Sequence, residues 1–442
     1  MRSLFTYGFA LVNQLTPPVI SYFNHCSINP NLSMRILHTA DWHLGQRFCD
    51  LDRKEEHDLF LRWLLKALKE HQPDALLVAG DVFDVGYPAK YAETQYYDFL
   101  KEAFLLCPNI IITGGNHDSP NALNAPRNLL SSFNIHVVGG AFANIEEEII
   151  PVKDLNGNIL GIVAAVPYLR EGDVRTLQSG ENYQDKIIAY KQGIKQHYRE
   201  LCNASLPYKQ QGIPIIATGH LYAAGSVLSD TEDKEMHIIG HQGQMEVEIF
   251  PPEFDYIALG HIHKPQMVNG NRHIRYSGSP IPLSFSERND SKQVLLAEFE
   301  PHHGLTNIIS LPVPLYRSLH RFKGSYESVI QQLGKFEHAS ALKSCWAEIH
   351  LLIETFNFNF EEPVKQLAKE KNIDILKFPN PKFITNPSEQ NVEEPADLDF
   401  LENSTQVFLE KCKAGRVSEE NLTELKYTFN ELMEIMSLKE SN

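Results

Sequence analysis

Residues 75–81 read ALLVAGD, so a run of apolar residues ends in Gly80 and Asp81 follows directly. An apolar run of this length, bounded by a turn residue, is typical of a β-strand that is buried on both faces. Because a glycine lets the backbone turn sharply, the carboxylate that follows it can lie close to a bound ion. We therefore interpret this stretch as a buried strand that carries a ligand at its carboxyl end.

The same pattern occurs at four other places in the chain. The runs begin at residues 35, 110, 214 and 256, and the metal-type side chains that follow them are Asp41, His43, Asn116, His117, His220, His261 and His263. Helix-type patterns at residues 53–71 and 89–106 separate the first three runs. Alternating strands and helices predict an α/β fold with parallel strands, whose ligands gather at the carboxyl ends. The polar side chains are therefore expected to share one cleft.

Each of these motifs also has an ordinary structural explanation. Asp81 could cap the next helix, and the segment 116–118 could be a polar turn. A single histidine such as His220 is more often a core residue than a metal ligand. The pair His261 and His263 is more specific, because two imidazoles two residues apart seldom pack together by chance. The joint occurrence of all five motifs at strand ends favours a metal site.

The expected ligand set consists of oxygen and imidazole donors without a thiolate. This set favours manganese, iron or magnesium over a structural zinc, with manganese as the first choice. The candidates outnumber what one ion can hold, so we expect two divalent ions, with Asp81 suited to bridge them. His117 is expected to protonate a leaving oxygen while Asp118 orients its ring. The alternative for His117 is a structural role beside the site.

The composition limits the class of protein. A chain of 442 residues is long enough for two or three domains. Its net charge of -16 argues against holding nucleic acid by bulk electrostatic attraction, so metal ions or a partner must supply positive charge. The 6 cysteines show no CxxC pair, which favours a reducing cytoplasm. No apolar stretch is long enough to span a membrane.

In chain order, the motifs read D-x-H, GD-x-x-D, GNHD, GH and GHxH, and they resemble those of the calcineurin-like metallophosphoesterases. Longer matching phrases stand at residues 37–46, 219–224, 258–266 and 276–285. The resemblance runs from Met34 to about Glu300 and more loosely beyond. It implies a four-layer α/β/β/α sandwich of two facing sheets flanked by helices.

The resemblance also implies an assignment of the ligands. One ion would be held by Asp41, His43, Asp81 and His263, and the other by Asp81, Asn116, His220 and His261. His117 would be the catalytic histidine. The leader before Met34 departs from the family pattern. A signal peptide is one interpretation of it, and a start codon upstream of the true start at Met34 is the one we favour.

The longer phrases resemble the bacterial nuclease subunits that work with an SMC-like ATPase. They imply a metal-dependent exonuclease of double-stranded DNA and endonuclease of single strands and hairpins, acting in DNA end processing, repair and recombination. They also imply a homodimer within a heterotetramer. Two alternatives are a phosphatase or phosphodiesterase of the same fold acting on a non-DNA substrate, and a scaffold for DNA ends without enzymatic activity. The intact ligand set argues against the scaffold.

We expect four segments along the chain. Residues 1–33 form the leader, 34–300 the metallophosphoesterase nuclease domain, 301–385 a smaller α+β cap domain, and 386–442 an acidic linker with helices. In the last segment, apolar residues at steps of three and four form a stripe of the coiled-coil type, namely Leu422, Leu425, Phe429, Leu432 and Met436. This stripe predicts a helix that binds a partner chain, and the alternative is a helix packed on its own domain.

Overall fold

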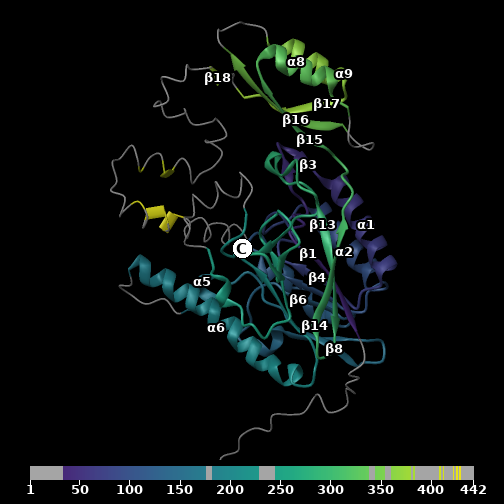
Figure 1. Cartoon of the computed structure of the whole chain (residues 1–442), viewed down its shortest axis with the longest axis vertical. Coiled ribbons are helices and arrows are strands. Elements are labelled where there is room, and N and C mark those ends of the chain that lie inside the picture. The colour runs from purple at the N-terminus through teal and green to yellow at the C-terminus, as the bar shows by residue number, and fades with distance from the viewer. Residues whose placement is uncertain are drawn as a thin grey trace, which may run out of the picture.

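The computed structural model describes residues 33–175, 182–227, 244–337, 344–353, 360–379 and 382–383, together with eight positions between 408 and 429. Residues 1–32 of the expected leader lie outside these ranges. The described residues form a larger unit on two six-stranded sheets and a smaller unit on a four-stranded sheet, which lies beside β3 in Figure 1.

The first sheet contains three of the five predicted motif strands. Its strands, in spatial order, are β14 (Gly304–Pro312), β13 (Gln293–Glu300), β1 (Met34–Thr39), β4 (Ala75–Ala79), β5 (Ile110–Thr113) and β6 (Ile135–Val138). The strands β1, β4, β5 and β6 run parallel to one another, as the alternation of strands and helices predicts. Their carboxyl ends therefore meet at one edge.

The second sheet contains the other two motif strands. Its order is β11 (Gln266–Val268), β12 (Asn271–Tyr276), β10 (Tyr256–Gly260), β9 (Ile215–His220), β8 (Ile159–Ala164) and β7 (Ile149–Lys153). The strands β9 and β10 are parallel, with Gly260 beside His220 in the register. The GH and GHxH motifs consequently lie next to each other.

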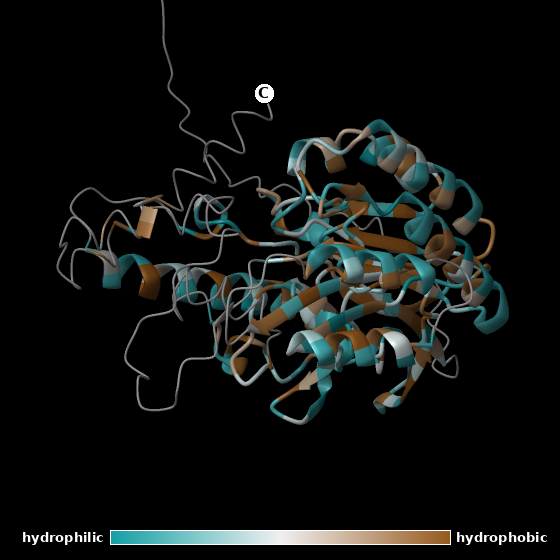
Figure 2. Cartoon of the chain, turned by 90° about the horizontal axis from the view of Figure 1, so that it is seen from above, coloured by the Kyte–Doolittle hydropathy of each residue, from teal (hydrophilic) through white to brown (hydrophobic). Residues whose placement is uncertain are grey.

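The alternation of side chains along the strands produces three layers of core. On β4, Leu76 and Val78 pack with the helices α1 (Lys54–His71) and α2 (Lys90–Ala103), whereas Leu77 faces the second sheet. The outer face of the second sheet is covered by α6 (Tyr183–Lys209). Figure 1 shows α1 and α2 on one side of the strands and α6 on the other, and in Figure 2 the strands between them are mostly hydrophobic. The α/β/β/α sandwich is thereby confirmed.

Shorter elements connect these layers. They are β2 (Arg47–Phe48), β3 (Leu51–Asp52), α3 (Pro120–Asn124), α4 (Arg127–Ser131), α5 (Glu171–Val174), and the single-turn 3₁₀ helices η1 (Ile145–Glu148), η3 (Val247–Ile249) and η4 (Phe285–Glu287). Among them, η4 lies between the metal-type residues of the larger unit and the first strand of the smaller unit.

The smaller unit is an α+β domain with its own core. Its parallel strands are β15 (Leu319–Gly324), β16 (Cys345–Ile353), β17 (Ile373–Lys377) and β18 (Lys382–Phe383), and its helices are α8 (Tyr326–Lys335) and α9 (Glu361–Glu370). Because β14 pairs with β13 in the first sheet, the boundary expected at residue 300 falls inside a hairpin. The smaller unit begins beyond Pro312.

The tail is described only at single positions. Leu422, Leu425 and Phe429 are helical, whereas Leu432 and Met436 lie outside the described residues. The ring of Phe429 stacks on that of Phe408, with centroids 4.3 Å apart, and Leu425 is 40% exposed. Part of the predicted stripe therefore packs within this chain and part faces outward. Among all described residues, no helix has the length and hydropathy needed to cross a bilayer.

Candidate metal centre

The two sheets bring their ligand-bearing strand ends into contact. The Nδ1 atom of His220, at the end of β9, lies 3.0 Å from the backbone oxygen of Ala79, at the end of β4. A Cβ atom on Gly80 would lie 2.1 Å from that same nitrogen, and Gly80 has a φ of +86°. Glycine is therefore required where Asp81 turns away from its strand, because any side chain there would displace His220.

Several of the predicted ligands have an unusual backbone conformation. The φ angles are 53° at Asp41, 46° at His43, 48° at Asp81 and 95° at His261. Non-glycine residues at positive φ are uncommon and costly, and they concentrate at functional sites where the surrounding fold imposes them. The strand ends thus hold these side chains in orientations that a relaxed chain would avoid.

The side chains converge in overlapping groups of possible ligands. Within each group the ligand atoms lie within 4.8 Å of one another, and the groups are Asp41 with His43 and His263, His43 with Asp81 and His117, and Asp41 with Asp81 and His220. The amide oxygen of Asn116 lies 3.0 Å from His220 Nε2 and 3.1 Å from His261 Nδ1. Every ligand predicted from the sequence therefore reaches one cluster.

Two buried atoms in this cluster lack a hydrogen-bond partner among the described residues. They are Oδ2 of Asp41 and Nε2 of His43. The other oxygen of Asp41 accepts the backbone N–H of His261 at 2.8 Å, and burial raises the pKa of Asp41 because its charged form is desolvated. An unsatisfied buried polar atom is costly, whereas a divalent cation would satisfy both atoms and neutralise the carboxylate. The residues present thus fit a metal centre.

Charge within the cluster is concentrated around Asp81. Burial opposes the charged form of His220, but the carboxylate of Asp81, 3.2 Å from Nε2, raises the pKa of this histidine to about 9. A proton on His220 stands where a cation would otherwise balance the carboxylates. Metal binding must displace that proton, so we expect metal affinity to rise with pH.

Three histidines are oriented by a partner on the ring nitrogen that faces away from the cluster. His43 Nδ1 lies 3.1 Å from Oδ1 of Asp84, and His263 Nδ1 lies 3.3 Å from Oε1 of Glu287. His220 uses the backbone oxygen of Ala79 in the same way. Such partners fix the tautomer and turn Nε2 towards the metal. The sequence indicated Asp84 through its motif, but it contained no signal for Glu287.

The two residues predicted to be catalytic have different environments. His117 is exposed, and its Nδ1 lies 2.8 Å from the backbone oxygen of Asp84. Asp118 is buried, and its carboxylate accepts backbone N–H groups of Val82, Phe83 and Gly115 at 3.1, 2.9 and 2.8 Å. The structure therefore corrects the role expected of Asp118. It joins the loops after β4 and β5, while the carbonyl of Asp84 orients His117.

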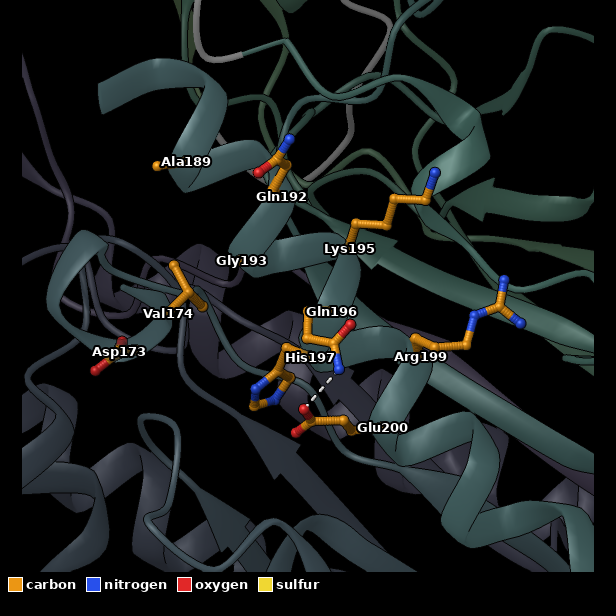
Figure 3. A pocket seen from close by; sticks show the side chains of 10 residues that line it. All are labelled: Asp173, Val174, Ala189, Gln192, Gly193, Lys195, Gln196, His197, Arg199 and Glu200. Carbon is orange, nitrogen blue, oxygen red and sulfur yellow. Dashed lines mark hydrogen bonds between the residues drawn. The ribbon is translucent and has the colours of Figure 1, made fainter. Parts of the chain in front are cut away.

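A separate surface hollow of about 660 Å³ lies along α5 and α6. Figure 3 shows its lining, which includes Lys195, Arg199 and a hydrogen bond of 2.8 Å between Gln196 and Glu200. None of the residues that line it belongs to the predicted ligand set. The metal-type cluster is consequently distinct from this hollow.

Comparison with known proteins agrees with this arrangement. The family model of the calcineurin-like phosphoesterases matches residues 34–265, and that of the type 5 capsule protein repressor C-terminal domain matches residues 315–414. The protein described as the SbcD component of the nuclease SbcCD in Escherichia coli K12 is 37% identical over 347 residues, which cover 78% of this chain and 84% of that protein. Its namesake in Rhodobacter capsulatus is 35% identical over 64% of this chain and 71% of that one. The corresponding protein of Bacillus subtilis is 32% identical over 61% and 67%. With a family model over more than half of its length and relatives of this similarity, the chain belongs to the SbcD family of nuclease subunits within the calcineurin-like phosphoesterases.

Proposed function

We propose that this chain hydrolyses DNA phosphodiester bonds with two divalent metal ions, of which manganese is the first choice. The observation that carries the proposal is the convergence of carboxylate, amide and imidazole ligands from both sheets around buried atoms of Asp41 and His43 that have no hydrogen-bond partner among the described residues. Nitrogen and oxygen donors without a thiolate suit manganese. The relatives are described as nuclease subunits, which favours DNA over other phosphate esters.

The ligands divide between the two ions as the family pattern implies. Asp41, His43, Asp81 and His263 hold one, and Asp81, Asn116, His220 and His261 hold the other. The overlapping groups around Asp41 and Asp81 support this division. When bound, the ions activate a water molecule and offset the charge of the phosphate. His117 stands at the exposed side, where its ring can deliver a proton to the leaving oxygen.

The first test compares substrates. With manganese, the full-length protein is expected to cut labelled duplex and hairpin DNA, and a chelator is expected to abolish the cutting because the ligands alone supply no water activation. A generic phosphomonoester is expected to remain at the rate of the blank. Rapid turnover of the monoester together with intact DNA would instead favour the phosphatase of the same fold. The readouts are gel analysis of DNA fragments and release of phosphate, each with and without the ATPase and ATP.

We also infer an assembly around this nuclease. The Escherichia coli relative is described as a subunit of SbcCD, so the partner is an SMC-like ATPase, SbcC, in a heterotetramer built on a homodimer of this chain in the cytoplasm. Residues 34–312 form the nuclease unit, and the smaller unit acts as a cap. The acidic tail is the partner-binding segment. Its Leu425 is 40% exposed although it is apolar, which suits a helix that another chain covers.

The second test removes the tail. Ending the chain near Pro387 is expected to leave manganese-dependent cleavage of single strands nearly unchanged, because no predicted metal ligand lies beyond that point. The truncation is expected to abolish co-elution with the ATPase on a sizing column and the ATP-stimulated attack on duplex ends. Leu425→Glu serves as the matched point variant, since it changes the exposed position and spares the stack of Phe429 on Phe408. Undiminished complexes in both variants would mean that the ATPase binds elsewhere.

A further inference from the structure

A buried carboxylate stands directly behind one of the metal-type histidines. Glu287 is 1% exposed, and its Oε1 atom lies 3.3 Å from Nδ1 of His263. Its Oε2 atom accepts the backbone N–H of Leu283 at 3.1 Å and a bond from Lys292 Nζ at 2.6 Å. Burial opposes its charge, but Lys292 lowers the pKa of Glu287, so it is an anion. An anion at Nδ1 holds the proton there and leaves Nε2 for a metal ion.

Lys292 ties this carboxylate to the backbone of the same histidine. Its ammonium group, only 4% exposed, donates to the backbone oxygen of His263 at 3.0 Å and to Oγ of Ser279 at 2.9 Å. The ion pair therefore holds His263 by its ring through Glu287 and by its main chain through Lys292. Because the pair is buried, its geometry is little screened by solvent.

The same 3₁₀ turn also contacts the smaller unit. Phe285, two residues before Glu287 in η4, packs edge-on against Phe48 with ring centroids 5.0 Å apart. Both rings belong to one buried cluster with Leu319 of β15 and Trp346 of β16. Trp346 in turn stacks on Phe48 at 5.5 Å. A single turn thus carries the metal-centre carboxylate at one residue and the contact with the smaller unit two residues earlier.

Charged groups fix this contact in place. Oε1 of Glu56 accepts from Arg53 Nε at 3.0 Å and from Arg317 Nε at 2.7 Å, and all three side chains are buried. The guanidinium of Arg317 lies 4.1 Å from the ring centroid of Trp346. Arg53 also donates to the backbone oxygen of Pro282 at 2.8 Å, within the segment that leads into η4. A displacement of the smaller unit would therefore pull on this segment.

We propose that Glu287 is a positioning residue for His263 and that η4 transmits the seating of the smaller unit to the metal centre. The inference rests on the proposed two-metal function. Displacing Trp346 and Leu319 from Phe285 turns η4, moves the Glu287 carboxylate from Nδ1 of His263, and weakens one of the two metal sites. The smaller unit can thereby regulate cleavage without contacting DNA itself.

The positioning role is tested with Glu287→Gln in the full-length protein. Removing a partner of this kind typically costs 10- to 100-fold in metal affinity, so calorimetry is expected to show one manganese step weakened by about that factor and the other unchanged. At limiting manganese, electron paramagnetic resonance is expected to show isolated ions instead of a coupled pair. Cleavage is expected to recover at high manganese concentration. The double variant with Lys292→Met, which leaves no unpaired buried charge, is expected to behave in the same way and covers loss of folding in the single variant.

Glu148→Gln is the matched control for this experiment. Glu148 is equally buried, and it accepts from His197 Nε2 at 2.7 Å and from the backbone N–H of Phe142 at 2.9 Å, but it contacts none of the predicted ligands. Its two manganese steps are expected to match those of the wild type. Wild-type binding in the Glu287 variants as well would overturn the positioning role. If the wild-type protein itself binds no pair of ions, the proposed function fails instead, and the two failures are thereby separated.

The transmission through η4 is tested with Phe285→Leu. This change loosens the contact with the smaller unit and alters no group at the metal centre, yet it is expected to weaken the same manganese step. Combined with Glu287→Gln, the loss is expected to equal the larger single loss instead of the product of both, because one path carries both effects. Phe250→Leu is the control, since Phe250 is also 6% exposed and packs edge-on against Tyr198 at 5.0 Å. Unchanged manganese binding in Phe285→Leu would overturn the transmission.

Discussion

Replacing Asp81 with asparagine is expected to reduce metal-dependent cleavage to the background rate. Its Oδ2 atom lies 3.2 Å from His220 Nε2 and 3.5 Å from His43 Nε2, so it stands between side chains assigned to different ions. A carboxylate can bridge two cations with both oxygens, whereas the amide of asparagine offers one neutral oxygen and a nitrogen that repels them. The variant should lose the bridge and with it the closely spaced pair of ions.

The fold of the Asp81→Asn protein is expected to remain intact. The oxygen of the asparagine can still accept the backbone N–H of His117, now at 2.9 Å from Oδ1, and one of several buried negative charges is removed. Without metal, the melting temperature should therefore equal or exceed that of the wild type. With manganese, the wild type should gain stability and the variant should gain less, because ligand binding stabilises only in proportion to affinity.

Asp74→Asn is the control for this substitution. Asp74 directly precedes β4 and accepts the backbone N–H of Arg35 at 2.7 Å, at the opposite end of the strand from Asp81. Its replacement should leave manganese content and cleavage as in the wild type. Metal analysis, melting curves and a nuclease assay on all three proteins decide the question. Full activity of Asp81→Asn with two bound ions would sink the bridging assignment.

Replacing His117 with alanine is expected to slow cleavage by roughly 100- to 10,000-fold, as loss of a positioned acid typically does. The residue is exposed at the edge of the cluster, and the carbonyl of Asp84 occupies its Nδ1 at 2.8 Å. Nε2 is then the nitrogen that can exchange a proton with a substrate. Because the other ligands stay in place, both ions and DNA binding should be retained.

His43→Ala is the comparison that separates chemistry from metal binding. Its ring lies beside that of His117, with centroids 4.8 Å apart, so the two variants remove equal groups from neighbouring positions. The His43 variant should lose manganese, and the His117 variant should keep it. Counting bound metal and measuring single-turnover rates at saturating manganese gives the answer. A His117→Ala protein with only one ion would make this histidine a ligand, consistent with its place in a group with His43 and Asp81.

Much of the fold followed from local patterns. The apolar runs before Asp41, Asp81, His220 and His261 correspond to β1, β4, β9 and β10, because strands buried on both faces leave a continuous apolar signal. The helix patterns at residues 53–71 and 89–106 correspond to α1 and α2. The boundary at residue 300 was misplaced because β14 has no catalytic motif, and only its pairing with β13 assigns it to the larger unit.

The candidate site was predicted in its members and corrected in its supporting contacts. Asp118 adjoins His117 in sequence, which made it the natural candidate to orient that ring. In the structure, three backbone N–H groups occupy its carboxylate, and the carbonyl of Asp84 orients the ring instead. Glu287 escaped notice altogether, since it lies 24 positions from His263 in a turn without a motif.

By itself, the sequence determined which side chains can bind metal and that each follows a buried strand, because both properties depend on residue type and on spacing over a few positions. Only the tertiary structure decided which strand ends meet, such as Ala79 with His220 across 141 positions, and which groups hold the ligands in place. It also decided that Glu56 joins Arg53 to Arg317 across 261 positions. Contacts of this kind arise from packing the sheets and the smaller unit together, and packing is a property of the whole chain that no local pattern encodes.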